Sequence, residues 1–303
     1  MRRPALGYAM VLTAASLWAV NGVISKVIIE SGGVSTQRLT EVRTTGAFLL
    51  LAAALAIGRP ATLRVRRAEL PMLLIFGLLG LAFVQWLYFE AISRLDIGVA
   101  LLIQYVAPVL VALWARLVYH EAVRHRIWAA LALSILGIAL LVELWNGLTL
   151  DGLGVAAALG SAATFAVYVL SAERAVARRD PLSLVCYGFL LASIFWAIFQ
   201  PWSSFPVELV NDTTSLLGRI EHLSLPVWLL MAWMVVLGTI VPFALLAASL
   251  RHIPASRAAI TAMFEPVAAT VFAFAWLGEA LTTFQLAGAF VVLTAIVLAQ
   301  TAR

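Results

Sequence analysis

The segment Val106-Ala107-Pro108-Val109, followed by Glu121-Ala122, recurs as Phe264-Glu265-Pro266-Val267, followed by Glu279-Ala280. The two copies are separated by 158 residues. A motif that returns once, about half a chain length later, is typical of a duplicated structural unit. The repeat therefore predicts a protein built from two related halves.

The repeat extends outward from these two segments. Gly80 and Gly238 keep the offset of 158 residues, whereas Gly7 and Gly154, near the two starts, are 147 residues apart. The difference of 11 residues fits in one place, the long segment 200–226. We therefore expect the second half to differ from the first mainly by this insertion.

Composition assigns the chain to the membrane proteins. Hydrophobic residues make up 63% of the 303 residues and charged residues only 12%, against roughly 25% charged residues in soluble domains. The net charge of +5 is carried mostly by short loops, which argues for membrane orientation rather than for binding of nucleic acid. The single cysteine, Cys186, provides no disulfide framework.

Ten apolar runs have about the 20 residues that a membrane-spanning helix needs. The runs are 8–29, 36–57, 70–91, 97–118, 126–144, 152–172, 181–200, 227–250, 255–277 and 283–300. Five runs fall in each half, and an odd number makes the second half enter the membrane from the opposite side. We predict an all-α membrane protein of ten transmembrane helices, arranged as two inverted five-helix repeats at residues 1–147 and 148–303.

Arginines indicate which side of the membrane each loop occupies. They concentrate in alternate loops and near both chain ends, at Arg2, Arg3, Arg59, Arg64, Arg66, Arg67, Arg124, Arg126, Arg174, Arg178, Arg179, Arg251, Arg257 and Arg303. Because positively charged loops stay on the cytoplasmic side, both termini are expected to be cytoplasmic. The first run also resembles a signal peptide, but it is longer than a signal core and nine similar runs follow, so we expect it to remain as a span.

Motifs for cofactor or metal chemistry are missing from the sequence. The single lysine, Lys26, follows Ser25 inside the first run, so no phosphate-binding loop of the P-loop type exists. His120 and His125 are five positions apart, which places them on different faces of a helix, unlike the ligands of a zinc protease. We expect no cofactor and no metal.

One acidic residue lies at the centre of a predicted span. Charge at that depth costs roughly 2.5–3.5 kcal/mol and calls for a specific role. Glu265 directly precedes Pro266, which frees a backbone carbonyl one turn earlier, whereas the other half has Ala107 before Pro108. This divergence at equal depth is expected if one asymmetric ligand binds between the halves. We interpret Glu265 as the proton-coupling residue or the partner of a substrate ammonium group, and both prolines as helix hinges.

A second charged group lies in the outer half of the first three spans. It comprises Lys26, Glu30, Glu41, Arg43 and Glu90. These residues could neutralise one another, or Arg43 could bind a substrate carboxylate, because its planar guanidinium is preorganised for that contact. Glu265 has a similar alternative, a structural ion pair with Arg43 or Lys26.

Amide and aromatic side chains near mid-span complete the candidate site. Packing or lipid contact is the alternative role for each of the aromatic residues. The candidate substrate-binding residues are Trp18, Asn21, Arg43, Gln85, Trp86, Gln104, Tyr105, Tyr168 and Glu265.

These motifs resemble the EamA-type family of the drug/metabolite transporter superfamily. The resemblance covers nearly the whole chain and rests on the two Pro…Glu segments, Gln285-Leu286-Ala287-Gly288, Arg43 and Gly238-Thr239. It implies a ten-helix carrier in a bacterial cytoplasmic membrane, often an exporter of amino acids, related metabolites or drugs. One departure is Tyr119-His120-Glu121, where the family often has Leu-Gly-Glu, and it predicts a stiffer helix end.

The sequence therefore predicts a secondary transporter that works by alternating access. Export of a small amphipathic metabolite, with an amino acid as the first candidate, would be coupled to inward proton flow. The expected partners are a small-molecule substrate and the lipid bilayer, with a homodimer as one option and no nucleic acid. The alternatives are a membrane-embedded enzyme acting on a lipid, an uptake carrier or facilitator of the same fold, a pore, and a purely structural protein.

Overall fold

The computed structural model describes residues 3–30, 34–95, 97–120, 122–145, 151–278 and 280–301. Four residues used in the sequence argument lie outside these ranges, namely Arg2, Glu121, Glu279 and Arg303.

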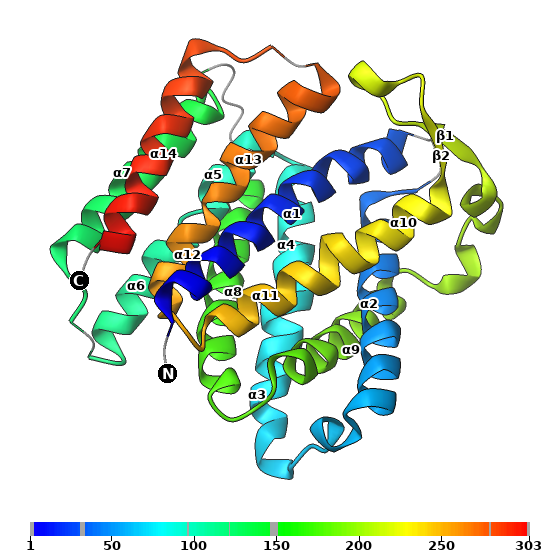
Figure 1. Ribbon diagram of the computed structural model, residues 1–303, viewed down its shortest axis with the longest axis horizontal. Helices are drawn as coiled ribbons and strands as arrows, with labels where there is room; N and C mark the ends of the chain where they lie inside the picture. Colours follow the sequence, from blue (N-terminus) through cyan, green and yellow to red (C-terminus); the bar gives the residue numbers. More distant parts are fainter. Residues whose placement is uncertain are drawn as a thin grey trace.

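Helices dominate the described chain (Figure 1). The α-helices are α1 (Pro4–Glu30), α2 (Thr36–Gly58), α3 (Leu70–Leu74), α4 (Val84–Ile92), α5 (Ile97–Gln104), α6 (Ala107–Leu117), α7 (His125–Leu141), α8 (Gly152–Val176), α9 (Pro181–Phe199), α10 (Val227–Val235), α11 (Val241–Ser249), α12 (Ala255–Ala262), α13 (Phe264–Phe272) and α14 (Thr283–Thr301). Three π-helical stretches continue some of them: η3 (Ile75–Phe83), η7 (Val236–Ile240) and η8 (Ala273–Leu277). Short 3₁₀ turns are η1 (Pro60–Leu63), η2 (Arg67–Glu69), η4 (Trp202–Ser204), η5 (Val207–Asn211) and η6 (Gly218–Ile220).

These helices combine into ten apolar spans, numbered in chain order. Within the described ranges, nine are long and apolar enough to cross a membrane, and the fifth, α7, is shorter at 17 residues. Span 3 joins α3, η3 and α4, span 4 joins α5 and α6, span 8 joins α10, η7 and α11, and span 9 joins α12, α13 and η8. The predicted all-α architecture of ten spans in two related halves is confirmed.

Side-chain caps fix where several helices begin. The Asp180 carboxylate accepts hydrogen bonds from the backbone N–H groups of Leu182 (3.0 Å) and Ser183 (3.2 Å), and Pro181 occupies the first turn of α9. Asp151 accepts from the N–H of Gly154 at 2.8 Å at the start of α8. Such contacts satisfy backbone donors that have no partner within the helix.

The insertion predicted at residues 200–226 forms a small cap on one end of the bundle. It holds the antiparallel strands β1 (Thr213–Ser215) and β2 (Ser224–Pro226), with Thr214 opposite Leu225. The indole of Trp276 donates to the Leu216 carbonyl at 2.8 Å, which attaches the cap to span 9. We call this end of the bundle the hairpin end.

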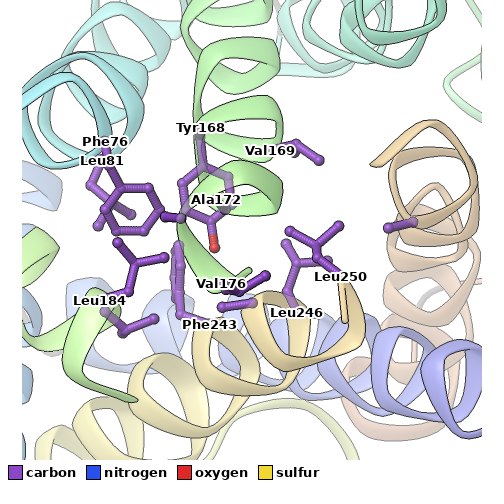
Figure 2. Packing of buried hydrophobic residues seen from close by; sticks show 14 of the residues in the cluster. Phe76, Leu81, Tyr168, Val169, Ala172, Val176, Leu184, Phe243, Leu246 and Leu250 are labelled. Atoms are coloured by element: carbon purple, nitrogen blue, oxygen red, sulfur yellow. The ribbon is translucent and has the colours of Figure 1, made fainter. Parts of the chain in front are cut away.

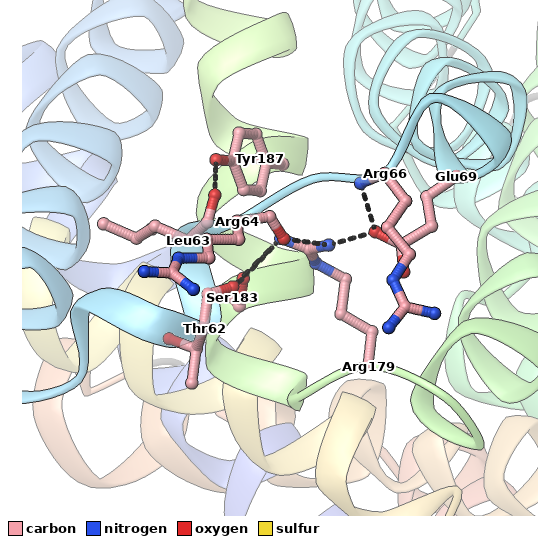
Figure 3. A network of polar contacts seen from close by, with 8 residues as sticks. All are labelled: Thr62, Leu63, Arg64, Arg66, Glu69, Arg179, Ser183 and Tyr187. Carbon is pink, nitrogen blue, oxygen red and sulfur yellow. Dashed lines mark hydrogen bonds and ion pairs between the residues drawn. The ribbon is translucent and has the colours of Figure 1, made fainter.

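The opposite end is the arginine-rich end, formed by residues 59–69, 177–181 and 250–254. The N–H of Arg3 lies 3.4 Å from the Nδ1 of His252, so the N-terminus is at this end, and Figure 1 shows both chain ends away from the hairpin. Buried Arg179 connects the two halves here: it donates to Glu69 (2.6 Å), to the Thr62 carbonyl (3.1 Å) and to Ser183 (2.8 Å) (Figure 3).

The repeat offsets of the sequence are visible in the backbone. The π-helical stretches η3 and η7 occupy equivalent positions and contain Gly80 and Gly238. The helix ends at His120 and Gly278, which are also 158 residues apart, both have left-handed backbone, with φ of 54° and 76°. His120 thus adopts the left-handed conformation that glycine favours at helix ends, and the greater stiffness expected of this end stays a prediction.

Two glycine contacts join the halves reciprocally. A Cβ at Gly80 would lie 2.9 Å from the Cα of Tyr168 on α8, and a Cβ at Gly238 would overlap with the Oδ1 of Asn21 on α1. Asn21 and Tyr168 are themselves equivalent under the offset of 147 residues. The same glycine crossing is thus built twice, once by each half.

Candidate functional site

A cavity of about 320 Å³ lies between the two halves. Trp18, Asn21 and Ser25 of α1 line it, as do Gln85 and Tyr88 of α4, so it separates spans 1 and 3. It reaches Thr36, the first residue of α2. The cavity therefore extends from mid-depth toward the hairpin end.

Two helix breaks place polar groups in this cavity. Span 4 breaks between α5 and α6, just before Pro108, and span 9 breaks at Met263, just before Glu265 and Pro266. The Tyr105 hydroxyl donates to Glu265 Oε2 at 3.2 Å, so the two breaks are directly linked. The predicted hinge prolines thus follow breaks in equivalent helices.

Arg43 of α2 lines the same cavity. Its Nε is buried without a hydrogen-bond partner, and among the described residues it forms no ion pair with Glu265. The two charges nevertheless act on each other electrostatically, so the alternative of mutual neutralisation between Arg43 and Glu265 stays open. Other members of the outer charged group do pair: Glu41 with Arg38, which is buried, and Glu90 with Arg94 at 2.7 Å on the surface.

Two amide side chains add acceptors without partners. Asn21 Oδ1 and Gln85 Oε1 are both buried with no hydrogen-bond donor among the described residues. Gln104 instead has a structural contact, since its Nε2 donates to the Ser161 hydroxyl at 2.8 Å, which donates to the Val84 carbonyl at 3.0 Å. The residues that line the cavity thus include one guanidinium, from Arg43, and one carboxylate, from Glu265.

Eight of the nine candidate residues line the cavity; Trp86 does not. Trp86 is 40% exposed and contacts the rings of Phe83, Phe195 and Phe199 at 5.5–6.1 Å. Trp86 lies outside the cavity because one residue along a helix rotates the side chain by about 100° away from Gln85. Lipid contact and packing explain Trp86.

Sequence reasoning missed several residues that line the cavity. They are Ser25, Thr40, Tyr88, Phe89, Phe165 and Phe243. A signal for some of them was present: Tyr88 and Phe89 lie three and four positions after Gln85 and share its helix face. Phe165 is also the repeat equivalent of Trp18.

The arginine-rich side of the cavity is closed by an apolar plug (Figure 2). Tyr168 and Val176 of α8 pack with Phe243, Leu246 and Leu250 of span 8 and the turn after it. The Phe243 ring lies 5.9 Å from that of Tyr168 and 5.1 Å from that of Trp18. The Tyr168 hydroxyl is buried in the plug without a hydrogen-bond partner in the described structure.

Polar contacts strengthen the plug from outside. Arg251 donates to the carbonyl oxygens of Val176 (3.0 Å) and Arg179 (2.8 Å), and the Glu173 carboxylate accepts from the N–H of Ala255 at 2.8 Å. No group of three or more His, Cys, Asp or Glu side chains that could hold a metal ion is found in the described ranges. The site is therefore a solute-sized pocket, open toward one end and sealed toward the other.

Comparisons with known proteins agree with this architecture. The sequence model of the EamA-like transporter family matches residues 5–143 and again residues 152–301. The chain is 30% identical over 261 residues to the threonine/homoserine exporter RhtA of Salmonella typhimurium, covering 86% of this chain and 78% of the relative. It is 24% identical over 298 residues to the uncharacterized inner membrane transporter YicL of the same species, covering 96% and 94%. A solved crystal structure superposes with a TM-score of 0.78 at 19% identity, over 98% of this chain and 97% of that chain, which shows the shared fold.

Proposed function

Because the chain belongs to the EamA-like transporter family, we propose that it exports a small zwitterionic metabolite, with an amino acid as the first candidate, by proton antiport. The coarser conclusion is established: this is a multi-pass membrane transporter for a small molecule. The solute, the direction and the coupling ion are the proposal.

The observation that carries the proposal is that Arg43, whose Nε has no hydrogen-bond partner in the described structure, lines the same cavity as Glu265. A guanidinium fork suits a carboxylate, and a carboxylate suits an ammonium group. The volume of about 320 Å³ is at the lower end of small-molecule sites, which favours a solute of amino-acid size.

The repeat explains how such a site would alternate. Cavity residues Asn21, Ser25, Gln85 and Tyr88 have the repeat equivalents Tyr168, Ala172, Phe243 and Leu246, all four of which belong to the plug. Spans 1 and 3 are therefore separated by the cavity, whereas the equivalent spans 6 and 8 are packed against each other in the plug. An exchange of these two arrangements would close the hairpin end and open the arginine-rich end.

Glu265 is the residue we assign to proton coupling. Asp is absent from the described cavity lining, and Glu265 is its one acidic side chain. The Glu265 carboxylate can bind either a proton or the substrate ammonium group, but not both, so proton and substrate compete for it. With the termini and the arginine-rich end in the cytoplasm of a bacterium, as the distribution of arginines predicts, such competition would drive the solute outward as protons enter.

The test is counterflow and proton-driven flux in proteoliposomes, with candidate amino acids supplied on either side. We expect Glu265→Gln to abolish flux driven by a pH gradient, because the amide cannot take up and release a proton, while the fold is kept, since glutamine can still accept the Tyr105 hydrogen bond. Glu90→Gln, at an exposed ion pair, is the matched control. Gradient-driven flux at the wild-type rate in the Glu265 variant would refute the coupling role.

The same assay separates the remaining alternatives. Uptake would give accumulation when the gradient has the opposite sign, and a facilitator would give equal flux with and without it. We propose no enzymatic activity, because neither histidine nor cysteine is among the described residues that line the cavity. The site is complete within one chain, so a homodimer stays a prediction that the function does not require.

A further inference from the structure

A second, larger concavity lies outside the central site, on the surface formed by spans 3, 4 and 6. Its volume is about 1230 Å³. Nearly all of its walls are apolar: Pro71 and Ile75 of span 3, Leu110 and Leu117 of α6, and Val167 of α8 are representative. We call it the lateral groove.

The lateral groove follows the length of α8, the helix of span 6. Its lining there extends from Ala163 to Ala177, the C-cap residue of α8, which at about 1.5 Å per residue is roughly 21 Å of helix. One leaflet of the hydrocarbon core is about 15 Å thick. An acyl chain of a membrane lipid therefore fits lengthwise in the groove.

Two arginines lie where the groove meets the arginine-rich end. Arg174 and Arg178 are exposed members of its lining. The Arg174 guanidinium is held 4.3 Å above the ring of Tyr119, which contacts Trp114 edge-on at 6.4 Å. Neither arginine forms an ion pair with a carboxylate in the described part of the chain.

The nearby carboxylates have other partners. Glu69 binds Arg179 at 2.6 Å, and Asp180 lies 3.8 Å from Arg59 and caps α9. Positive charge at the mouth of the groove is therefore not neutralised by these two acids. An apolar channel of leaflet depth that ends at two cations is complementary to a lipid with an anionic headgroup.

We propose that the lateral groove binds one anionic phospholipid of the leaflet at the arginine-rich end, with its phosphate on Arg174 and Arg178 and one acyl chain between spans 3, 4 and 6. Phosphatidylglycerol is the probe that represents this class. The proposal does not depend on which solute the central cavity carries.

The experiment is native mass spectrometry of the purified full-length protein, titrated with phosphatidylglycerol or phosphatidylcholine of identical acyl chains. We expect the wild type to bind one phosphatidylglycerol in preference. The double variant Arg174→Gln/Arg178→Gln should lose about 30-fold in affinity, because each arginine near a membrane surface contributes roughly fivefold. The matched double variant Arg124→Gln/Arg126→Gln, which removes two exposed arginines outside the groove, should retain wild-type affinity.

Two further arms make the outcome decisive. Ala163→Trp fills the groove while both arginines remain, so it should also abolish binding of the lipid. Glycerol phosphate, the headgroup without chains, should not compete at concentrations that match the lipid. Equal binding of the two lipids by the wild type, equal losses in both arginine double variants, or full competition by glycerol phosphate would each overturn the proposal. Melting temperature in phosphatidylcholine verifies that each variant is folded.

Discussion

Tyr168→Phe should stabilise the protein, although it removes a polar group from its interior. Tyr168 is 1% exposed, and its hydroxyl lies in the apolar plug without a hydrogen-bond partner in the described structure. Phenylalanine keeps the ring contacts, at 5.2 Å to Phe76 and 5.9 Å to Phe243. What is lost is an unsatisfied hydroxyl, whose burial costs about 1–3 kcal/mol.

Tyr187→Phe is the matched control with the opposite expected sign. The Tyr187 hydroxyl donates to the Leu63 carbonyl at the same end of the molecule (Figure 3). Removing a satisfied donor forfeits about 0.5–1.5 kcal/mol and leaves a carbonyl without that partner. The two tyrosine variants should therefore differ by about 1.5–4.5 kcal/mol, with the wild type between them.

The assay is thermal unfolding of the purified variants in one detergent. At a few degrees per kcal/mol, Tyr168→Phe should raise the melting temperature and Tyr187→Phe should lower it. Opening of the arginine-rich end would hydrate the Tyr168 hydroxyl, so Tyr168→Phe should also favour the closed plug by roughly 5- to 150-fold and slow transport. A lower melting temperature for Tyr168→Phe would refute the reasoning, because it would mean that the hydroxyl has a stabilising partner.

Three other predictions test packing and charge elsewhere in the structure. Gly288→Ala should lower the melting temperature by an amount equivalent to about 1–3 kcal/mol, since a Cβ there would lie 2.6 Å from backbone atoms of α7. The control Gly22→Ala should not lower it, because a Cβ there has no neighbour within 4 Å. Arg38→Met should lower the free energy of unfolding by about 3–5 kcal/mol in chemical denaturation, because Glu41 would keep a buried charge without its ion pair. Unfolding of this variant at the wild-type denaturant concentration would contradict the prediction. Arg43→Lys should weaken solute binding about tenfold in isothermal titration while the melting temperature of the free protein stays unchanged, since a point charge replaces a bidentate fork; unaltered affinity would remove Arg43 from the site.

The architecture was predictable because two strong signals agree. Apolar runs of span length located every helical span, and the constant offset between Pro108 and Pro266 located the two halves. The same offset also relates details that hydrophobicity alone does not reveal, such as the left-handed residues His120 and Gly278. Duplication makes one half a template for the other.

The sequence predicted how deep in the membrane the candidate site residues lie, but it predicted their hydrogen-bond and ion-pair partners less well. The central position of Glu265 followed from the sequence, and its hydrogen bond to Tyr105 follows from two helix breaks that composition does not specify. The pairing of Glu41 with Arg38 rather than with Arg43 depends on helix rotation. Whether the residues around the cavity bind substrate stays a prediction.

The plug was the feature least accessible to sequence reasoning. Tyr168 was a candidate cavity residue, and its ring does border the cavity, but its hydroxyl lies in an apolar cluster with Phe243. Equivalent residues in the two halves have different environments, and the sequence alone does not say which half is closed. That asymmetry belongs to the conformation rather than to the fold.

The reciprocal contacts at Gly80 and Gly238 have a mechanical consequence. Where two helices cross at a glycine, no side chain of that residue interdigitates with the neighbouring helix. The helices can therefore change their crossing angle while they stay in contact. Each half provides one such glycine contact to the other: Gly80 contacts Tyr168, and Gly238 contacts Asn21. The two halves can therefore rotate relative to each other in opposite directions while these two glycine contacts keep them packed together at the centre of the molecule.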